Sequence, residues 1–469
     1  MVWTRKHIEI TFFFTVFVLL CHMLFFPSYT MPSPILLGGF CVILFFFFAF
    51  QGYTNSWKGT YDIKTRLFLH SLLYRIISLF VLYYLTALYD PENLPFELAA
   101  SDAYNYHKSG VIVADAVFEG RNVFDALSHF WKNEADYGFS LWIGTIYILF
   151  GKSVLAVKVF NAIVGSFTVV RIYQITKFSY GEKQARVAGI LTMLMPSLLW
   201  FTGIFLKETL LIFLIANIGY YTTQIIKTNK FRIPNTLIIL GLFGTIFFFR
   251  TVLVPLLLGC VLLQIVFYQT KNKNYRIFAG FITAVLIVGS LFVTYELSMD
   301  KHIESAIEAS QDQFGTELDK ASTDRGINYS VALVAPLLIS GAIITPFPSL
   351  LNFEDRQIGI YAHFQNEIIR NIMYFFVFLG LIRFIKHRKR KAIFPASFAI
   401  LYILILAVSG ISFQDRFQVL ALPFLIVFMS DGVVAQYHNK EKHWVLYLVF
   451  IFMAILAWNL FKLSNRGLL

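Results

Sequence analysis

Long apolar runs separated by short polar stretches dominate the chain. A membrane-spanning helix needs about 20 consecutive, mostly apolar residues, and runs of nearly this length recur throughout the sequence. We therefore predict an all-α polytopic membrane protein with about 13 transmembrane helices. The predicted spans lie near residues 8–26, 34–50, 67–88, 153–175, 187–203, 205–225, 234–249, 251–268, 277–296, 367–386, 393–411, 417–434 and 444–462.

Residues 1–66 hold the first two predicted spans and residues 435–469 hold the last one. Two long polar loops, 89–138 and 297–329, lie between spans of the remaining part, residues 67–434. Long structured loops often carry function, so the first of these loops is the place to look for chemistry.

Loop charges predict the orientation of the chain. With the N-terminus in the cytoplasm, every short loop assigned to the inside is basic and both long loops outside are acidic, as the positive-inside rule requires. The shorter apolar runs 139–150 and 330–350 would reverse this pattern if they crossed the membrane. We therefore expect them to be re-entrant or surface-lying segments on the outer side.

The composition excludes a soluble protein. The chain is 58% hydrophobic and 14% charged, whereas a soluble domain is about 45–50% apolar and about 25% charged. A net charge of +12 could indicate nucleic-acid binding, but the basic residues lie in the predicted inside loops, so we expect no nucleic-acid partner. There is no P-loop and no internal repeat, which argues against an ATP-driven pump and a secondary transporter.

The first long loop contains the sequence Ser101-Asp-Ala-Tyr-Asn-Tyr-His107, followed by an amphipathic stretch. We expect that stretch to lie as a helix along the outer membrane surface. Asp102 is our candidate catalytic base, and Tyr104, Tyr106 and His107 are the candidate substrate-binding residues beside it. The alternative interpretation is that Asp102 only caps the following helix.

Cationic side chains recur at the outer ends of predicted spans. Lys207 and Glu208 are adjacent at the junction of two spans, and Arg250 and Arg416 each lie beside an apolar run. Charges at membrane depth often mark function, and a guanidinium suits a phosphate because it makes paired, charge-assisted hydrogen bonds. The alternatives are a self-satisfied Lys–Glu pair and arginines that only anchor the span ends.

These residue types together favour one kind of chemistry. Cations at the membrane surface can bind and neutralise a phosphate leaving group. A carboxylate can take a proton from an acceptor hydroxyl, which is worth roughly 10²–10⁴-fold in rate. The sequence therefore favours transfer of a group from an activated lipid phosphate, with no need for ATP.

Over residues 67–434 the chain resembles the GT-C class of polyprenyl-phosphate-sugar-dependent glycosyltransferases, the group of protein mannosyltransferases and aminoarabinose transferases. The resemblance rests on the order of five features. These are the loop motif around Asp102, the aromatic run Tyr137 to Gly151 with Lys152-Ser153, the span and basic turn ending Tyr180-Gly-Glu-Lys183, Pro196 before Lys207-Glu208, and Arg416 before Pro423.

The resemblance implies an inverting sugar transfer from a polyprenyl-phosphate donor to a lipid, glycan or protein acceptor. It implies that Asp102 is the base and that Arg416 contacts the phosphate. It also implies a bacterial inner membrane, with the active site periplasmic or extracellular. Many relatives have a second acid directly after the loop aspartate, where this chain has Ala103, so we assign no metal ligand and no cofactor and leave metal dependence open.

Two other functions remain as alternatives. A polysaccharide polymerase or ligase acting on lipid-linked glycans would also need outer arginines and a long outer loop, although such enzymes usually place that loop late in the chain. A lipid-glycan flippase or transporter would favour repeats and carboxylates inside the membrane, of which the sequence shows almost none.

Overall fold

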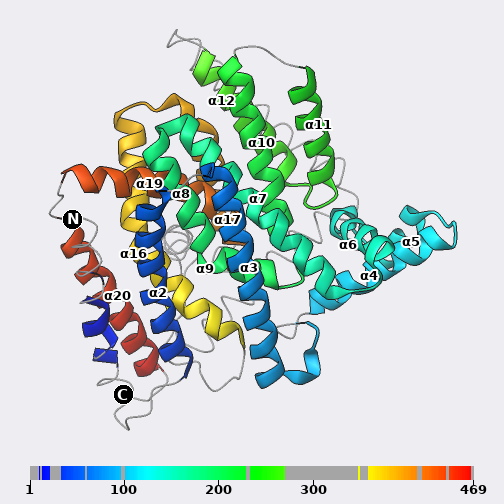
Figure 1. Cartoon of the computed structure of the whole chain (residues 1–469), viewed down its shortest axis with the longest axis horizontal. Helices are drawn as coiled ribbons and strands as arrows, with labels where there is room; N and C mark the ends of the chain where they lie inside the picture. Colours follow the sequence, from blue (N-terminus) through cyan, green and yellow to red (C-terminus); the bar gives the residue numbers. More distant parts are fainter. Residues whose placement is uncertain are drawn as a thin grey trace.

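The computed structural model describes residues 10, 13–18, 20–21, 33–58, 61–96, 101–228, 233–269, 347–348, 358–408, 415–439 and 443–465. Every regular element within these residues is a helix (Figure 1). The α-helices from residue 33 onwards are α2 (Ser33–Ser56), α3 (Ile63–Tyr89), α4 (Ser101–Phe118), α5 (Val123–Phe130), α6 (Tyr137–Phe150), α7 (Val154–Tyr180), α8 (Glu182–Leu194), α9 (Pro196–Gly203), α10 (Glu208–Thr228), α11 (Ile233–Phe247), α12 (Leu253–Gln269), α16 (Ile358–Lys386), α17 (Ile393–Val408), α18 (Asp415–Gln418), α19 (Leu422–Asn439) and α20 (His443–Asn465). The short 3₁₀ helices are η1 (Pro91–Asn93), η2 (Glu134–Asp136) and η3 (Arg390–Ala392).

The all-α, multispanning architecture predicted from the sequence is confirmed, but the count of 13 spans is not shown. Among the described residues, six helices are long and apolar enough to cross a membrane, or seven if the bent pair α8–α9 forms one span. Helices α11, α12 and α19 are apolar but shorter. The predicted span 277–296 and the second loop 297–329 lie outside the described residues, as does nearly all of 330–350 and much of 8–26.

The chain bends sharply between α8 and α9, just before the segment that carries Lys207 and Glu208. The two helices bend by 46° at Pro196, which is the first residue of α9 and cannot donate a backbone hydrogen bond. Arg75 of α3 is buried opposite α9 and donates to the Leu198 carbonyl oxygen at 2.7 Å and to the Thr202 hydroxyl. This buried cation is therefore satisfied by polar groups of the broken segment, as membrane-embedded charges must be.

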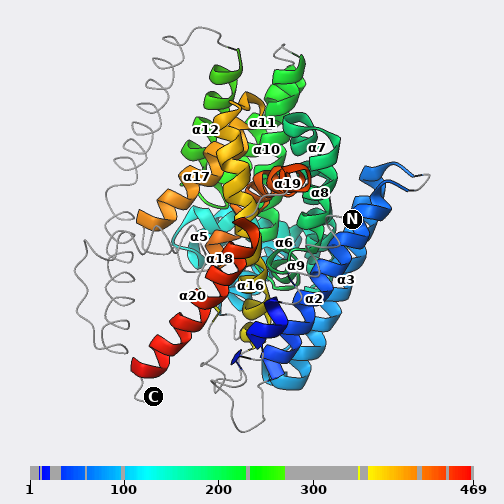
Figure 2. The ribbon, with the colours of Figure 1, turned by 90° about the vertical axis from the view of Figure 1, so that its left-hand side faces the viewer.

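Helices α4, α5 and α6, formed by the first long loop and the apolar run that follows it, pack together at one side of the bundle, and α4 and α6 share its hydrophobic core. Figure 1 shows α4, α5 and α6 together on the side opposite α20, and Figure 2 places them behind α20. Glycines bring α4 and α6 close, because an added Cβ at Gly110 would lie 2.2 Å from Ile143 and one at Gly144 would lie 2.2 Å from Val113. With 14 residues, α6 is shorter than a span needs to be.

Helices α16 and α19 are held together by an equally close glycine contact. An added Cβ at Gly432 would lie 2.1 Å from the Phe376 carbonyl oxygen, and one at Gly380 would lie 2.0 Å from the Phe428 carbonyl oxygen. Both obstacles are backbone atoms, so a rotamer change cannot relieve them. This contact fixes the helix that follows Arg416, and so it helps to position the polar cluster described below.

We expect Gly432→Ala to destabilise the protein by about 1–3 kcal/mol, the usual cost of overpacking. The measurement is thermal unfolding of the detergent-solubilised protein. Gly244→Ala is the matched control, since none of the described residues lies within 4 Å of a Cβ there, and Gly→Ala at an open helical site usually stabilises. Equal unfolding temperatures for the two variants would show that the α16–α19 contact is not tight.

Candidate active site

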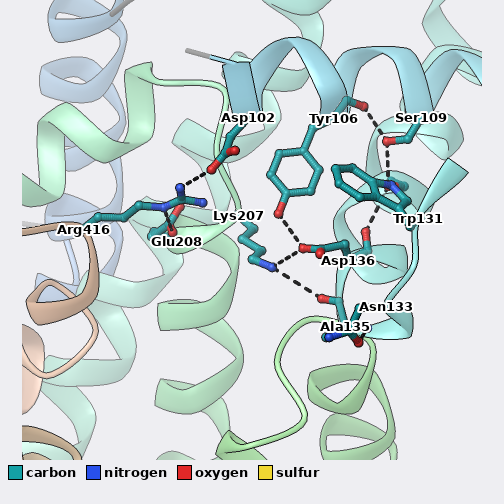
Figure 3. Close-up of polar contacts among 11 residues, drawn as sticks. Asp102, Tyr106, Ser109, Trp131, Asn133, Ala135, Asp136, Lys207, Glu208 and Arg416 are labelled. Carbon is teal, nitrogen blue, oxygen red and sulfur yellow. Dashed lines mark hydrogen bonds and ion pairs between the residues drawn. The ribbon is translucent and has the colours of Figure 1, made fainter. Parts of the chain in front are cut away.

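Hydrogen bonds between small side chains fix α4 against η2 and the start of α6. The hydroxyl oxygens of Ser109 on α4 and Ser140 on α6 are 2.7 Å apart, and the Trp131 indole N–H donates to Ser140 at 3.0 Å. Ser140 also donates to the Asp136 carbonyl oxygen. These contacts hold the first turns of α4 so that Asp102 faces Arg416 and Tyr106 faces Asp136 (Figure 3).

Asp102 belongs to a three-residue ion-pair network that joins distant parts of the chain. A terminal N–H of Arg416 donates to Asp102 Oδ2, and Arg416 Nε donates to Glu208 Oε1 at 2.6 Å. The Asp102 side chain is 52% exposed, whereas that of Glu208 is fully buried. Glu208 therefore holds the guanidinium in place from within, and Asp102 faces the accessible side.

A second network lies directly beside the first. Lys207 Nζ donates to Asp136 Oδ1 at 2.6 Å, and the Tyr106 hydroxyl donates to the same oxygen at 2.7 Å (Figure 3). The Lys207 ammonium also lies 5.7 Å from the centre of the Tyr106 ring. Because Lys207 and Glu208 are consecutive residues, the two networks meet where α10 begins.

Arg250 lies at the edge of these networks. Its guanidinium is 4.8 Å from the centre of the Phe417 ring and donates to the Tyr402 hydroxyl at 3.4 Å. The turn that carries it is tied to α6, because Gly138 N–H donates to the Phe248 carbonyl oxygen at 2.8 Å. Arg250 therefore adds a third cation beside Lys207 and Arg416.

The two other candidate binding residues point to different partners. His107 Nδ1 lies 2.7 Å from the Tyr147 hydroxyl oxygen, and its ring packs on Phe96. Tyr104 is half exposed, and the Lys108 ammonium lies 4.4 Å from the centre of its ring. The structure thus brings Asp102, Tyr106, Lys207, Glu208 and Arg416 together (Figure 3). Arg250 lies beside Phe417, the residue after Arg416, whereas Tyr104 and His107 contact Lys108 and Tyr147 instead.

Burial and neighbouring charges set the protonation of the cations. Burial lowers the pKa of the Lys207 ammonium below its ordinary value; Asp136 offsets part of this, and Arg250 adds to it. Burial also lowers the pKa of Arg416, but Glu208 and Asp102 outweigh it and raise the pKa above its ordinary value. Arg416 therefore stays charged at any working pH, whereas Lys207 becomes neutral more readily than an exposed lysine.

The polar cluster thus gathers three cations and three carboxylates at one end of an apolar bundle, which suits an anionic lipid head group. Residues 138–295 match the family model described as dolichyl-phosphate-mannose-protein mannosyltransferase, PMT_2. Over these residues the chain is similar to this family of membrane glycosyltransferases. No curated protein matches the chain.

The matched segment contains only part of the polar cluster. The matched segment of the glycosyltransferase includes Lys207, Glu208 and Arg250, whereas Asp102 and Arg416 lie outside it. The resemblance predicted from the sequence is confirmed, and the family implies a dolichyl- or polyprenyl-phosphate sugar donor.

Sequence reasoning missed Asp136 as a site residue of the glycosyltransferase. It was one of many acids in the first long loop, and nothing in its neighbourhood, Asn133-Glu-Ala-Asp136, marks it as special. Its role emerges only from its contacts with Lys207 and Tyr106. Within the described ranges, no three His, Cys, Asp or Glu side chains form a group that could hold a metal ion.

We expect Asp136→Asn to make donor binding more sensitive to alkaline pH. A phosphate bound at Lys207 would need the charged ammonium, which loses its proton as pH rises through a pKa already lowered by burial. Without the Asp136 carboxylate that pKa falls further, so the loss of affinity moves to lower pH. The measurement is the Kd for polyprenyl phosphate from neutral to alkaline pH.

The matched control for this substitution is Glu134→Gln, an exposed acid on the same 3₁₀ helix. It removes the same charge without touching Lys207. An identical alkaline profile in both variants would contradict a direct effect of Asp136 on the lysine.

Proposed function

We propose that the enzyme transfers a sugar from a polyprenyl-phosphate donor to an acceptor hydroxyl with inversion of the anomeric carbon. The observation that carries this proposal is the pairing of Asp102 with Arg416, which buried Glu208 holds beside Lys207. An accessible carboxylate and two fixed cations thus lie within one small cluster. This arrangement is suited to removing a proton on one side of a sugar and stabilising a departing phosphate on the other.

The cations would bind the phosphate of the donor. Arg416 has further N–H groups beyond the two that contact Glu208 and Asp102, since a guanidinium carries five. These N–H groups and the Lys207 ammonium would donate to the phosphate oxygens, with Arg250 adding positive charge. Fixed donors of this kind stabilise the negative charge that develops on the leaving group.

Asp102 would act as the base. Its carboxylate accepts the proton of the acceptor hydroxyl while that oxygen forms a bond to the anomeric carbon. The bond from this carbon to the phosphate oxygen breaks, and the polyprenyl phosphate leaves with the electron pair. Glu208 is fully buried, so it is a positioning residue for Arg416 and not a second base.

We further propose that the site opens to the outer face of the membrane. Helix α10 runs from Glu208 in the cluster to a last turn that contains Lys227, and the basic turn around η3 follows the end of α16. The positive-inside rule places such basic turns in the cytoplasm. The opposite end of α10, with the cluster, would then face outward.

The test is a transfer assay with the purified full chain in detergent and synthetic polyprenyl-phosphate sugars, read by mass spectrometry. The proposal predicts release of polyprenyl monophosphate and one sugar added to the acceptor. Transfer of a whole glycan would favour the polymerase or ligase alternative instead. Movement of intact donor across vesicles, with no released polyprenyl phosphate, would favour the flippase.

A further inference from the structure

A second candidate ligand site lies where α2, α3 and α8 meet. A cavity of about 500 Å³ is lined by Phe48, Gln51, Gly52, Asn55, Ser56, Lys58, Ile63, Arg66, Leu67, His70, Tyr74, Ile190 and Met193. Four of these residues, Gln51, Asn55, Lys58 and His70, are exposed. The cavity therefore opens at the surface of the bundle.

The two ends of this cavity differ in chemistry. Lys58, Arg66 and His70 lie around the end of α2, whereas the remaining wall is mostly apolar and includes Phe48 and Leu67. None of the described residues that line the cavity is a carboxylate. A wall that is basic at one end and apolar at the other matches an anionic amphiphile.

Local hydrogen bonds fix the basic end. Arg66 donates to the carbonyl oxygens of Asn55 at 3.1 Å and Ser56 at 2.9 Å, which lie in the last turn of α2. Its Nε is buried and has no acceptor among the described residues. His70 Nδ1 lies 2.7 Å from the Arg66 carbonyl oxygen. The Arg66 guanidinium is therefore held in place at the end of α2, with one buried N–H that no acceptor among the described residues satisfies.

This cavity is separate from the sugar-transfer site. It lies along the first half of α3, whereas Asp102 follows the far end of that helix. From Arg66 to Tyr89 the helix rises about 35 Å at 1.5 Å per residue, which is comparable to the thickness of a bilayer. A phosphate at Lys58 would therefore lie in the opposite leaflet from one at Lys207.

We propose that this cavity binds an anionic phospholipid. The lipid phosphate would lie at Lys58 and Arg66, and an acyl chain would follow the apolar wall toward Tyr74. Free phosphate shares the head-group chemistry, but it would leave the apolar wall uncovered. The bound lipid would hold α2 against α3 and α8. Helix α2 lies before residues 67–434, the part of the chain that resembles the glycosyltransferases.

The test is native mass spectrometry of the whole chain, residues 1–469, in detergent, titrated with phosphatidylglycerol, phosphatidylcholine or inorganic phosphate. We expect tight binding of one phosphatidylglycerol, with affinity about fivefold weaker in Lys58→Gln, given that one cation near an anionic lipid is worth roughly 1 kcal/mol. Lys64→Gln is the matched control, because it is a neighbouring exposed lysine outside the cavity.

Three outcomes would overturn the proposal. Equal loss in both lysine variants would show a general surface-charge effect. Equal affinity for phosphatidylcholine, whose choline cation balances its phosphate, would show that the net negative charge of the lipid is not recognised. Displacement of the lipid by millimolar inorganic phosphate would indicate a free-phosphate site. None of these results depends on sugar transfer, so the proposal can fail while the proposed function stands.

Discussion

Asp102→Asn is expected to lower the rate of sugar transfer by roughly 10²–10⁴-fold, the usual contribution of a general base. The amide has nearly the same shape as the carboxylate but cannot accept the proton. Asp102 is half exposed, so the fold should persist. Arg416 and Lys207 are unchanged, so the donor Kd should stay within a few-fold of the wild type. The measurement is kcat under saturating donor, together with donor Kd.

Asp115→Asn is the matched control for this substitution. Asp115 lies on the same helix and pairs with Lys152 at 2.7 Å, also at an accessible position. We expect it to leave kcat near the wild-type value. Unchanged turnover in Asp102→Asn would reject the aspartate as the base and leave its ion pair with Arg416 as its role.

Arg416→Gln is expected to abolish donor binding and to destabilise the protein by about 3–5 kcal/mol. Removing one partner of a buried ion pair leaves the other charge uncompensated, and Glu208 is fully buried. The lost binding follows from the loss of the fixed guanidinium that would hold the phosphate. Thermal unfolding and donor Kd measure the two effects separately.

A double variant separates stability from binding. Arg416→Gln combined with Glu208→Gln removes the stranded charge, so most of the stability should return while donor binding stays lost. Arg121→Gln, which breaks an exposed pair with Glu119, should cost at most about 1 kcal/mol. Recovery of donor affinity in the double variant would show that Arg416 has only a structural role.

The helical membrane class could be predicted from the sequence because a soluble fold cannot bury so many long apolar runs. The number of spans was harder to predict, because α11 and α12 are apolar yet have only 15 and 17 residues in the structure. Hydropathy alone does not distinguish a short helix in the bundle from a full span. The bent pair α8–α9 adds a second ambiguity, because the count is six spans without it and seven if it forms one span.

The sequence also indicated most of the charged residues that lie in the cluster, because charges beside apolar runs are costly and therefore conspicuous. It could not show which of them pair. Asp102 and Arg416 are separated by 314 positions, and Arg416 and Glu208 by 208. Asp136 was missed for the same reason, since it lies in a polar loop where an acid is ordinary.

The most direct test of the proposed chemistry is a structure of the enzyme with polyprenyl phosphate bound. We predict that the phosphate lies within hydrogen-bond distance of Lys207 Nζ and the Arg416 guanidinium, with Asp102 facing the open side. A phosphate bound elsewhere, out of reach of both cations, would contradict the proposed site.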